Sequence, residues 1–493
     1  MGQDSLPPAT EVLAAQPPPR PDDDAVRSSI RALRTDGRLL LAVLDDDPTG
    51  SQAVHGVQVV TVEDEDAYQA ALSGPAGTCF VLTNTRSLAG ADAVALNNRV
   101  ARGLLAAGGR VPGRVQFVSR SDSTLRGHVM TEVGALQAVR RSTAGQGYDG
   151  VLLVPAFVEA GRVTAGDIHW ARTGSGPATH LVPVGETEFA RDATFGYASS
   201  DLRDFVAEKS GGAVRRDDVL SLSLADIRDG GPDRVAAILS GVRDGRWVVV
   251  NATGYSDLDT VAYGALLAER TGRSFLFRTG PSFVRSLAGM GPKAPLRGAE
   301  LLGSGRAATP AGRAGHGLVV VGSHVGQTSR QVDALRAGGG VTEVELDVPA
   351  LLAGTEVVSA AAATVTAALT HSDVVLYTSR TLVRGQDRDG SLAIARTVSA
   401  ALSQVVRDTL AAGPAWVVAK GGITSHDVAV HGLGIRRAEV AGQLFPGVIS
   451  VFRPLDAAPG AAGRPYVVFA GNVGDDGTLA EVVAILNGDR EET

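Results

Sequence analysis

The chain has 493 residues, of which 44% are hydrophobic and 20% are charged, and its formal net charge is −7. This length exceeds what one hydrophobic core usually organises, so we expect two domains. Acidic and basic residues are mixed along the chain without a Lys/Arg cluster, and only 4% of the residues are aromatic, so we expect no nucleic-acid partner.

The beginning of the chain has no cationic start and no apolar segment, and it contains a run of three prolines and a run of three aspartates. It does not resemble a secretory signal, and we expect residues 1–37 to form a disordered tail. No later segment reaches about 18 uninterrupted apolar residues, so we expect no membrane partner. The single cysteine, Cys79, excludes an intrachain disulfide and favours a reducing, cytoplasmic location.

From Leu39 onward, short apolar runs alternate with longer segments that carry charges at helical spacing. This alternation predicts βα units and a parallel sheet. Nearly all-apolar strands are expected where both faces of a sheet are covered. They are predicted at residues 39–44, 79–83, 114–118, 151–154 and 247–250, then near 318–322, 373–377, 415–419 and 466–470.

A stretch rich in glycine, alanine and proline at residues 287–316 interrupts this pattern and predicts a linker. We therefore expect an α/β protein with two domains, at residues 38–286 and 317–493. Each domain should have a mostly parallel sheet flanked by helices, with a cleft between the domains.

Polar residues follow four predicted strands of the first domain. Ligands bind beyond the carboxyl ends of open parallel sheets, so these residues are candidates for a binding site. Arginine can clamp a carboxylate, and aspartate or asparagine can accept from hydroxyl groups, which suits a polyhydroxy acid. The candidates for substrate binding are Asp46, Thr49, Asn84, Arg86, Asp122, Ser123, Thr124 and Arg162, and an aspartate facing the reacting hydroxyl could accept its proton.

These residues also have structural interpretations. The run Asp45–Asp47 could cap a turn or the next helix, and Ser123-Thr124 could be a helix N-cap. His128 follows the polar run after the third strand and could line the site, whereas His55, His169 and His180 are better explained as structural or surface residues. No histidine pair has metal-ligand spacing, so we predict no protein metal site.

Glycine-rich turns follow three predicted strands of the second domain. Such turns let backbone N–H groups approach phosphate oxygens, although glycine is common at any strand-to-helix turn. The candidates for nucleotide binding are Ser323, Lys420, Gly421, Gly422, Ile423, Thr424, Gly471, Asn472 and Gly474. The chain has neither a Gly-x-x-x-x-Gly-Lys-Ser/Thr motif nor a dinucleotide-binding glycine fingerprint.

Lysine is rare in this chain, which has only Lys209, Lys293 and Lys420 among 46 basic residues. Lys420 lies directly before Gly421 at the end of a predicted strand. A compact ammonium group near phosphate would explain a lysine there, and chance placement explains it equally well.

The sequence resembles the four-carbon acid sugar kinase family from about Leu39 to about Leu486. The resemblance depends on several ordered motifs, which are 46–50 (DDPTG), 84–86 (NTR), 122–127 (DSTLRG), 155–157 (PAF), 161–162 (GR), 187–192 (TEFARD), 195–197 (FGY), 277–280 (FRTG), 322–323 (GS), 421–425 (GGITS) and 471–474 (GNVG). Pro48 stands where the family often has an aromatic residue, and His128 where it often has asparagine, which affects the expected substrate more than the reaction.

The resemblance implies a sugar-acid-binding domain followed by a nucleotide-binding domain. It further implies phosphorylation, with ATP and Mg²⁺, of the terminal O4 of a tetronate or 3-oxo-tetronate. By residue-to-residue correspondence, Asp47, Arg86, Asp122, Ser123 and Arg126 would approach the acid. Ser323, Gly421, Gly422, Ile423, Thr424 and Gly471 would contact ATP.

We expect in-line transfer of a phosphoryl group, with Asp47 as the catalytic base and Arg126 as a clamp for carboxylate or phosphate. A non-catalytic sugar-acid sensor is the main alternative, because two α/β domains around a cleft also describe solute-binding proteins. A dehydrogenase is disfavoured by the missing fingerprint. A homodimer is compatible with this prediction.

Overall fold

The computed structural model describes residues 8–47, 50–174, 180–302, 315–380, 383, 388–445, 447–471 and 473–488. The chain divides into two compact units. The first unit comprises Met1–Val57 and Val62–Pro292, and the second comprises Gln58–Thr61 and Lys293–Thr493. Among the described helices, none combines the length and the hydrophobicity that crossing a membrane requires.

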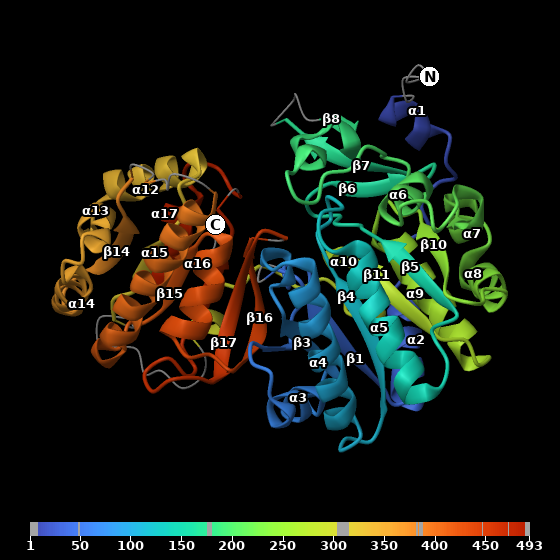
Figure 1. The fold of residues 1–493 in the computed structure, drawn as a ribbon, viewed down its shortest axis with the longest axis horizontal. Helices are drawn as coiled ribbons and strands as arrows, with labels where there is room; N and C mark the ends of the chain where they lie inside the picture. The colour runs from blue at the N-terminus through green and yellow to red at the C-terminus, as the bar shows by residue number, and fades with distance from the viewer. Residues whose placement is uncertain are drawn as a thin grey trace. The chain divides into compact units, whose positions relative to one another are not determined.

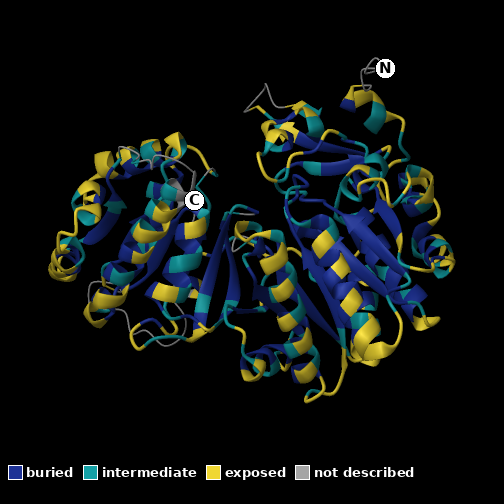
Figure 2. Ribbon diagram, viewed as in Figure 1, coloured by how far each residue is buried: buried dark blue, intermediate teal, exposed yellow. Residues whose placement is uncertain are grey.

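The first unit is built on a parallel sheet whose central strands are buried on both faces (Figures 1 and 2). The spatial order of its strands is β3-β1-β4-β11-β5-β10-β9, and every pairing between neighbours in this order is parallel. All carboxyl ends therefore meet at one edge. The strands are β1 (Leu39–Asp45), β3 (Thr78–Leu82), β4 (Arg114–Arg120), β5 (Gly150–Val154), β9 (Leu220–Leu222), β10 (Arg246–Val250) and β11 (Phe275–Thr279).

Helices cover both faces of this sheet. The contacting helices α3 (Glu65–Leu72), α4 (Gly90–Gly108) and α5 (Val129–Ala144) lie in front of it in Figure 1. A second group packs around α9 and comprises α2 (Asp24–Asp36), α7 (Leu224–Arg228), α8 (Gly231–Ser240), α9 (Tyr255–Arg270) and α10 (Pro281–Leu287). Helix α6 (Leu202–Lys209) contacts β10.

A small antiparallel sheet, labelled β6, β7 and β8 in Figure 1, supplements the first unit. It comprises β6 (Arg162–Ala165), β7 (Ile168–Thr173) and β8 (His180–Pro183). Trp170 of β7 is 1% exposed and belongs to a separate apolar cluster that includes Ala9 of helix α1 (Ala9–Ala14). The sequence patterns did not predict this sheet, because its strands are short and mix apolar with polar residues.

The second unit has a mixed sheet of order β13-β14-β12-β15-β18-β17-β16-β2. The first five strands are parallel, and β17, β16 and β2 continue the sheet with antiparallel pairing. These strands are β2 (Gln58–Val60), β12 (Leu318–Val321), β13 (Val341–Leu346), β14 (Asp373–Thr378), β15 (Val417–Lys420), β16 (Arg437–Phe445), β17 (Ile449–Asp456) and β18 (Tyr466–Phe469).

Trp416, with 1% exposure, belongs to the buried apolar cluster of this unit together with residues of β12, β15 and β18. The accompanying helices are α11 (Ala299–Leu302), α12 (Gly326–Gly338), α13 (Val348–Leu352), α14 (Val357–Ala368), α15 (Arg388–Thr409), α16 (Gly422–Asp427) and α17 (Thr478–Asn487). Helices α12 and α17 contact each other, as do α14 and α15 (Figure 1).

The predicted α/β class is confirmed, and each predicted strand matches an observed one within a few residues. The chain beginning differs from the expected disordered tail, because α2 is capped by Asp23 and buries Ile30. Arg27 of α2 also pairs with the buried Asp259 of α9 at 3.2 Å. Within the expected linker, Leu296 is 1% exposed, and residues 303–314 lie outside the described residues.

Candidate active site

Aspartates and an arginine interlock where β1 and β3 end. Asp46 is buried, and its Oδ1 lies 2.6 Å from Nη2 of Arg86. The Nη1 atom of Arg86 lies 3.0 Å from Oδ2 of Asp47. Arg86 is held there because Asn84 adopts a left-handed conformation with φ 50°, which lets the chain turn sharply after β3 into a 3-10 segment at residues 85–87.

A second layer of polar residues supports this pair from below. Arg120, the last residue of β4, donates to Asp45 at 2.6 Å, and Ser121 donates to Asp46 at 2.9 Å. Arg278 of β11 donates to Ser121 at 2.6 Å and pairs with Glu132 of α5. These groups are buried and mutually hydrogen-bonded, so they fix the orientation of Asp46 and are shielded from a ligand.

The loop after β4 contributes the second acid–arginine pair of the site. Oδ2 of Asp122 lies 2.6 Å from Nε of Arg126 and accepts a hydrogen bond from Thr124. Burial alone would raise the pKa of Asp122, but the nearby guanidinium groups of Arg86 and Arg126 and these hydrogen bonds outweigh it and hold the pKa well below its usual range. Asp122 is therefore an anion at every physiological pH.

The same loop is fixed by hydrogen bonds to its carbonyl groups. The fully buried His169 of β7 contacts the carbonyl oxygen of Ser123 through Nε2 at 2.7 Å, and the hydroxyl of Tyr197 donates to the carbonyl of Thr124 at 2.6 Å. Gly127 has φ 114°, and a Cβ there would lie 2.9 Å from Oδ2 of Asp46. His169 of the small sheet and Tyr197, which follows that sheet in the chain, thus hold the loop that carries Asp122 and Arg126.

Two arginines meet over one aromatic ring beside this loop. The guanidinium carbon of Arg126 lies 5.1 Å from the ring centroid of Phe189, and that of Arg162 lies 5.6 Å from it. Asp192 lies 3.8 Å from Nη1 of Arg126, which is too far for a hydrogen bond. The terminal N–H groups of Arg126 can therefore still donate to a ligand. Together with Arg86, these cations surround Asp122 and form a surface that can receive a carboxylate.

The structure brings most of the predicted acid-binding residues to one place. Asp47 and Arg126 retain 24% and 28% side-chain exposure, whereas Asp46 retains 2%. Ser123 and Thr124 are buried. Thr49 lies outside the described residues. His128 packs edge-on against Phe195, with ring centroids 4.9 Å apart.

Sequence patterns alone missed the supporting residues Arg278, Glu132 and Tyr197. Arg278 lies in β11, whose apolar run could have been predicted as a strand and was not. That apolar run is the signal that could have led to Arg278. His169 was expected to be structural. Its fully buried position under the loop gives it an indirect role in shaping the site.

In the second unit, three glycine-containing turns converge at the carboxyl ends of β12, β15 and β18. A Cβ at Gly322 would lie 2.3 Å from Oγ1 of Thr424, and one at Gly471 would lie 2.7 Å from Oγ of Ser323. Gly421 has φ 126°, a conformation that side chains disfavour, and its Cα lies 3.8 Å from the Cβ position of Gly471. The five residues thus form one compact, backbone-lined surface.

Lys420 lies beneath this surface as the last residue of β15. It is fully buried, its Nζ donates to the carbonyl of Ala470 at 2.7 Å, and the Nζ lies 3.6 Å from the ring centroid of Phe469. Burial lowers the pKa of Lys420 to about 7. The lysine therefore ties the turn after β15 to the turn after β18.

The remaining predicted nucleotide-binding residues frame the same turns. Ile423 is 63% exposed in α16, which begins at Gly422, and Gly474 packs against Thr478 at the start of α17. Asn472 lies outside the described residues. Arg380, which the sequence patterns did not single out, donates to the carbonyl of Ser323 at 2.9 Å.

The polar residues of the first unit and the glycine turns of the second are suited to different ligands. Guanidinium groups that surround the loop after β4 can bind a carboxylate, and the glycine turns of the second unit can present backbone N–H groups to phosphate. In the described part of the chain, no group of three or more His, Cys, Asp or Glu side chains is arranged to hold a metal ion.

Comparisons with known proteins agree with this division of roles. Residues 41–287 match a family model described as a sugar-binding N-terminal domain, and residues 318–479 match one described as a nucleotide-binding C-terminal domain. The fold and site thus define a two-domain α/β protein that pairs sugar binding with nucleotide binding. The chain belongs to the four-carbon acid sugar kinase family.

A D-erythronate kinase of Heliobacterium modesticaldum (strain ATCC 51547 / Ice1) is 28% identical over 274 residues, which are 55% of this chain and 53% of that protein. The match thus spans about half of the relative's length.

Two solved structures have the same fold at 17% identity, and each match covers 90% of this chain and 98% of the other. They are Haemophilus influenzae protein HI1011, with a TM-score of 0.58, and a protein described as a putative tRNA synthase from Salmonella typhimurium LT2, with a TM-score of 0.64.

Proposed function

We propose that this chain is an ATP-dependent, cytoplasmic kinase that phosphorylates the terminal O4 hydroxyl of a four-carbon sugar acid, a tetronate or 3-oxo-tetronate. The observation that carries the proposal is the grouping of Arg86, Arg126 and Arg162 around Asp122 in the domain that matches a sugar-binding family model. The relative named as a D-erythronate kinase supports this substrate class.

The arginines would hold the acid by its carboxylate. Arg126 is the best placed, because it is partly exposed and its position is fixed by Asp122 and by the ring of Phe189. A carboxylate held at one end of a four-carbon chain leaves the terminal hydroxyl at the other end. Binding by a positioned guanidinium therefore also selects which hydroxyl reacts.

Asp47 is the best candidate for the residue that orients this hydroxyl and accepts its proton. Asp45 and Asp46 are buried beneath it, and Asp122 is held as an anion by two arginines. Asp47 keeps 24% of its side chain exposed, and Arg86 lies on one of its carboxylate oxygens. A carboxylate that is both oriented and accessible suits a general base.

The nucleotide would bind on the glycine turns of the second domain. Backbone N–H groups at Gly422, the first residue of α16, and at Gly471 would receive the phosphates together with the hydroxyl groups of Ser323 and Thr424, while the Gly421 N–H is used by the carbonyl of Phe469. Mg²⁺ fits this site as a partner of the nucleotide, because Mg²⁺ usually binds through substrate phosphates and few protein carboxylates. It would neutralise charge on the transferred phosphoryl group.

The proposal is tested by measuring ATP consumption with a panel of C4 and C5 aldonates and their keto forms. We expect turnover with a C4 acid and formation of a 4-phosphate. A sugar-acid sensor would instead bind an acid in calorimetry and ignore ATP, with or without Mg²⁺, and this result would refute the kinase.

The role of Asp47 is tested with Asp47→Asn on the best substrate. We expect kcat to fall by about 100- to 1000-fold, because general base catalysis is lost while both ligands can still bind. Asp92→Asn, an exposed acid on α4, is the matched control. Near wild-type turnover in Asp47→Asn would mean that another group accepts the proton.

A further inference from the structure

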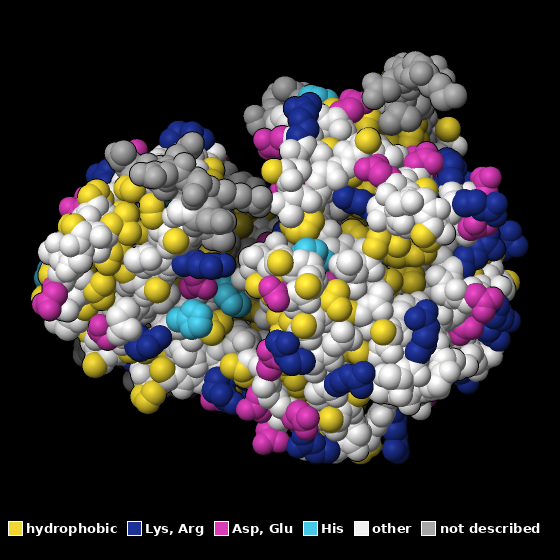
Figure 3. Space-filling view, viewed as in Figure 1, with side chains coloured by type: hydrophobic (Ala, Val, Ile, Leu, Met, Phe, Trp, Pro, Cys, Tyr) yellow, Lys and Arg dark blue, Asp and Glu magenta, His cyan; other side chains and the backbone are white. Residues whose placement is uncertain are grey.

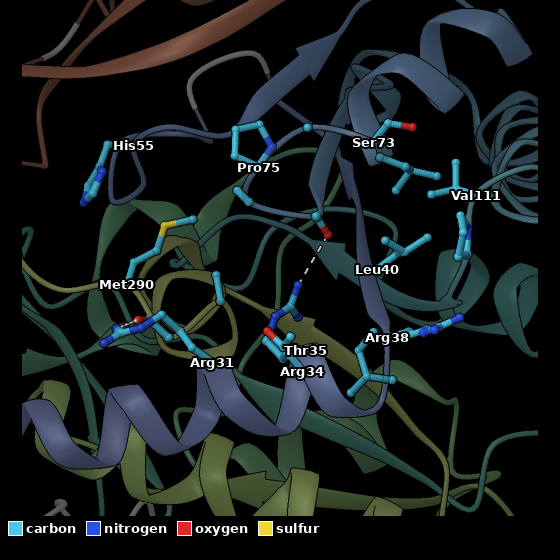
Figure 4. Close-up of a pocket in the computed structure, with 18 of the residues that line it drawn as sticks. Arg31, Arg34, Thr35, Arg38, Leu40, His55, Ser73, Pro75, Val111 and Met290 are labelled. Carbon is cyan, nitrogen blue, oxygen red and sulfur yellow. Dashed lines mark hydrogen bonds between the residues drawn. The ribbon is translucent and has the colours of Figure 1, made fainter.

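A cavity of about 670 Å³ opens in the first unit at the amino ends of β1 and β3, the edge opposite the candidate active site. Figure 4 shows helix α2 along one side, with Pro75 and Ser73 across from it. The volume falls within the range of cavities that bind small organic ligands. None of the family motifs described above lies in it.

The charged groups of this cavity are all basic. Arg31, Arg34 and Arg38 line it, and His55 lies at the end where Met290 is found (Figure 4). No aspartate or glutamate is among the lining residues that the structure describes. Arg31 and Arg34 are one helical turn apart on α2 and Arg38 follows the end of this helix, so a row of cations runs along one wall.

Arg34 is a buried cation whose charge is only partly balanced. It is 6% exposed, and its Nη2 donates to the carbonyl of Gly77 at 3.3 Å and to Oγ1 of Thr78 at 3.4 Å. Its Nη1 has no hydrogen-bond partner, and among the described residues no carboxylate lies within ion-pair distance of it, although the charge of Glu269 offsets part of its own. Burial lowers the pKa of Arg34 to about 10, so it stays charged at neutral pH.

The two outer arginines are exposed and keep unused donors. Arg31 donates to the carbonyl of Gly289 at 2.5 Å and to Oγ of Ser28 at 2.7 Å, and its Nη2 lies 4.0 Å from Oδ2 of the exposed Asp24, which still leaves part of its guanidinium available. For Arg38, no side-chain hydrogen bond or ion pair occurs within the described ranges. An anion in the cavity would satisfy these donors and offset the charge of Arg34.

We propose that this cavity is a second ligand site, which binds a small organic anion with phosphate or carboxylate groups. Leu40, Val111, Pro75 and Met290 give its wall an apolar part, which suits the carbon skeleton of such a ligand. The site goes beyond the proposed kinase function. It lies at the start of β1, whereas Asp46 follows its end, so the two sites are separated by roughly 20 Å of strand.

The test is calorimetric titration of the full chain with two probes, sodium pyrophosphate and sodium succinate, at fixed ionic strength and without ATP, Mg²⁺ or sugar acid. The variants are Arg31→Gln/Arg38→Gln and, as a control with the same change in net charge, Arg102→Gln/Arg141→Gln on the exposed surfaces of α4 and α5. Thermal unfolding verifies that each variant is folded, and Arg38→Gln alone replaces the double variant if that one is not.

We expect the wild type and the control to bind one probe equally, and Arg31→Gln/Arg38→Gln to bind it at least tenfold more weakly or to lose one equivalent. The probe that shows this loss identifies the anion as phosphate-like or carboxylate-like. Equal binding by all three proteins, or equal weakening in both double variants, would overturn the proposal. Because turnover is not measured, failure here is distinct from failure of the proposed kinase function.

Discussion

The carboxyl ends of the strands are built differently in the two units. In the first unit they carry charged side chains, such as Asp46, Arg86 and Arg126, which are held in a hydrogen-bonded network. In the second unit they are glycine turns, such as those at Gly422 and Gly471, where the backbone is partly exposed. Both constructions can receive an anion, but one uses side-chain charge and the other uses space for backbone N–H groups.

The difference indicates which substitutions each region tolerates. Removing one member of a charged network is destabilising, because its partner is left buried without a compensating charge. A glycine-lined surface instead loses its shape when a side-chain atom is added to it. On the face of the molecule that Figure 3 displays, basic and acidic side chains are interspersed, and no large patch of one charge is seen there.

The largest expected effect comes from removing a charge in the first unit. Arg126→Gln should lower kcat/KM for the sugar acid by about 100- to 1000-fold, because one partner of a charge-assisted contact is lost. The ATP affinity, measured by calorimetry, should change by less than about twofold. Arg141→Gln is the control. If ATP binding were lost and acid binding kept, the assignment of the two ligands to the two units would be reversed.

Adding an atom to the second unit should have the next largest effect. Gly322→Ala places a Cβ about 2.3 Å from Oγ1 of Thr424 and should weaken ATP binding by about 10- to 100-fold while leaving acid binding unchanged. Gly326→Ala is the matched control in the same turn, because its nearest neighbour would be Nη1 of Arg330 at 3.6 Å. Equal ATP affinities in the two variants would contradict a nucleotide site at this turn.

The sequence predicted the exposed ends of the strands better than what lies beneath them. Asp122 and Arg126 follow a recognisable apolar strand, so their position at the sheet edge could be predicted from the pattern. The supporting role of Arg278 could not be predicted in this way. It depends on β11 lying between β4 and β5 in the sheet, and these strands are not neighbours of β11 along the chain. The helix α2 was not predicted, because it has few apolar residues. Those it has, such as Ile30, become buried only when α2 packs against the rest of the unit, including α9.

The two units also contain buried ionisable groups whose effects on stability have opposite signs. Lys420 has a pKa of about 7 when folded against an ordinary value of 10.5. The unfolded chain binds more protons between these values, so the free energy of unfolding should rise with pH from about 7 to 10.5. Below pH 7 the buried charge should cost on the order of 5 kcal/mol.

Lys420→Met removes this charge. The variant should exceed the wild type in thermal unfolding midpoint at pH 7, and the difference should shrink as pH approaches 10. Lys293→Met, which changes an exposed lysine of the same unit, should show no such trend. A constant difference across this range would mean that Lys420 is not the titrating group.

Asp45 in the first unit should give the reverse trend. Burial raises the pKa of Asp45 to about 7, against the opposing charge of Arg120 and with the help of Asp46 and Asp47. The folded protein then binds more protons between about pH 4 and 7, so stability is present below this window and is lost as pH rises through it.

Asp45→Asn does not titrate, so its unfolding midpoint relative to the wild type should increase from pH 4.5 to pH 7.5, by an amount on the order of 3 kcal/mol in the free energy of unfolding. Asp229→Asn, at an exposed position, is the control. Should the relative midpoint stay flat, Arg120 would be compensating Asp45 fully as an anion. The charged network of the first unit would then extend down to the last residue of β1, with no neutral acid at its base.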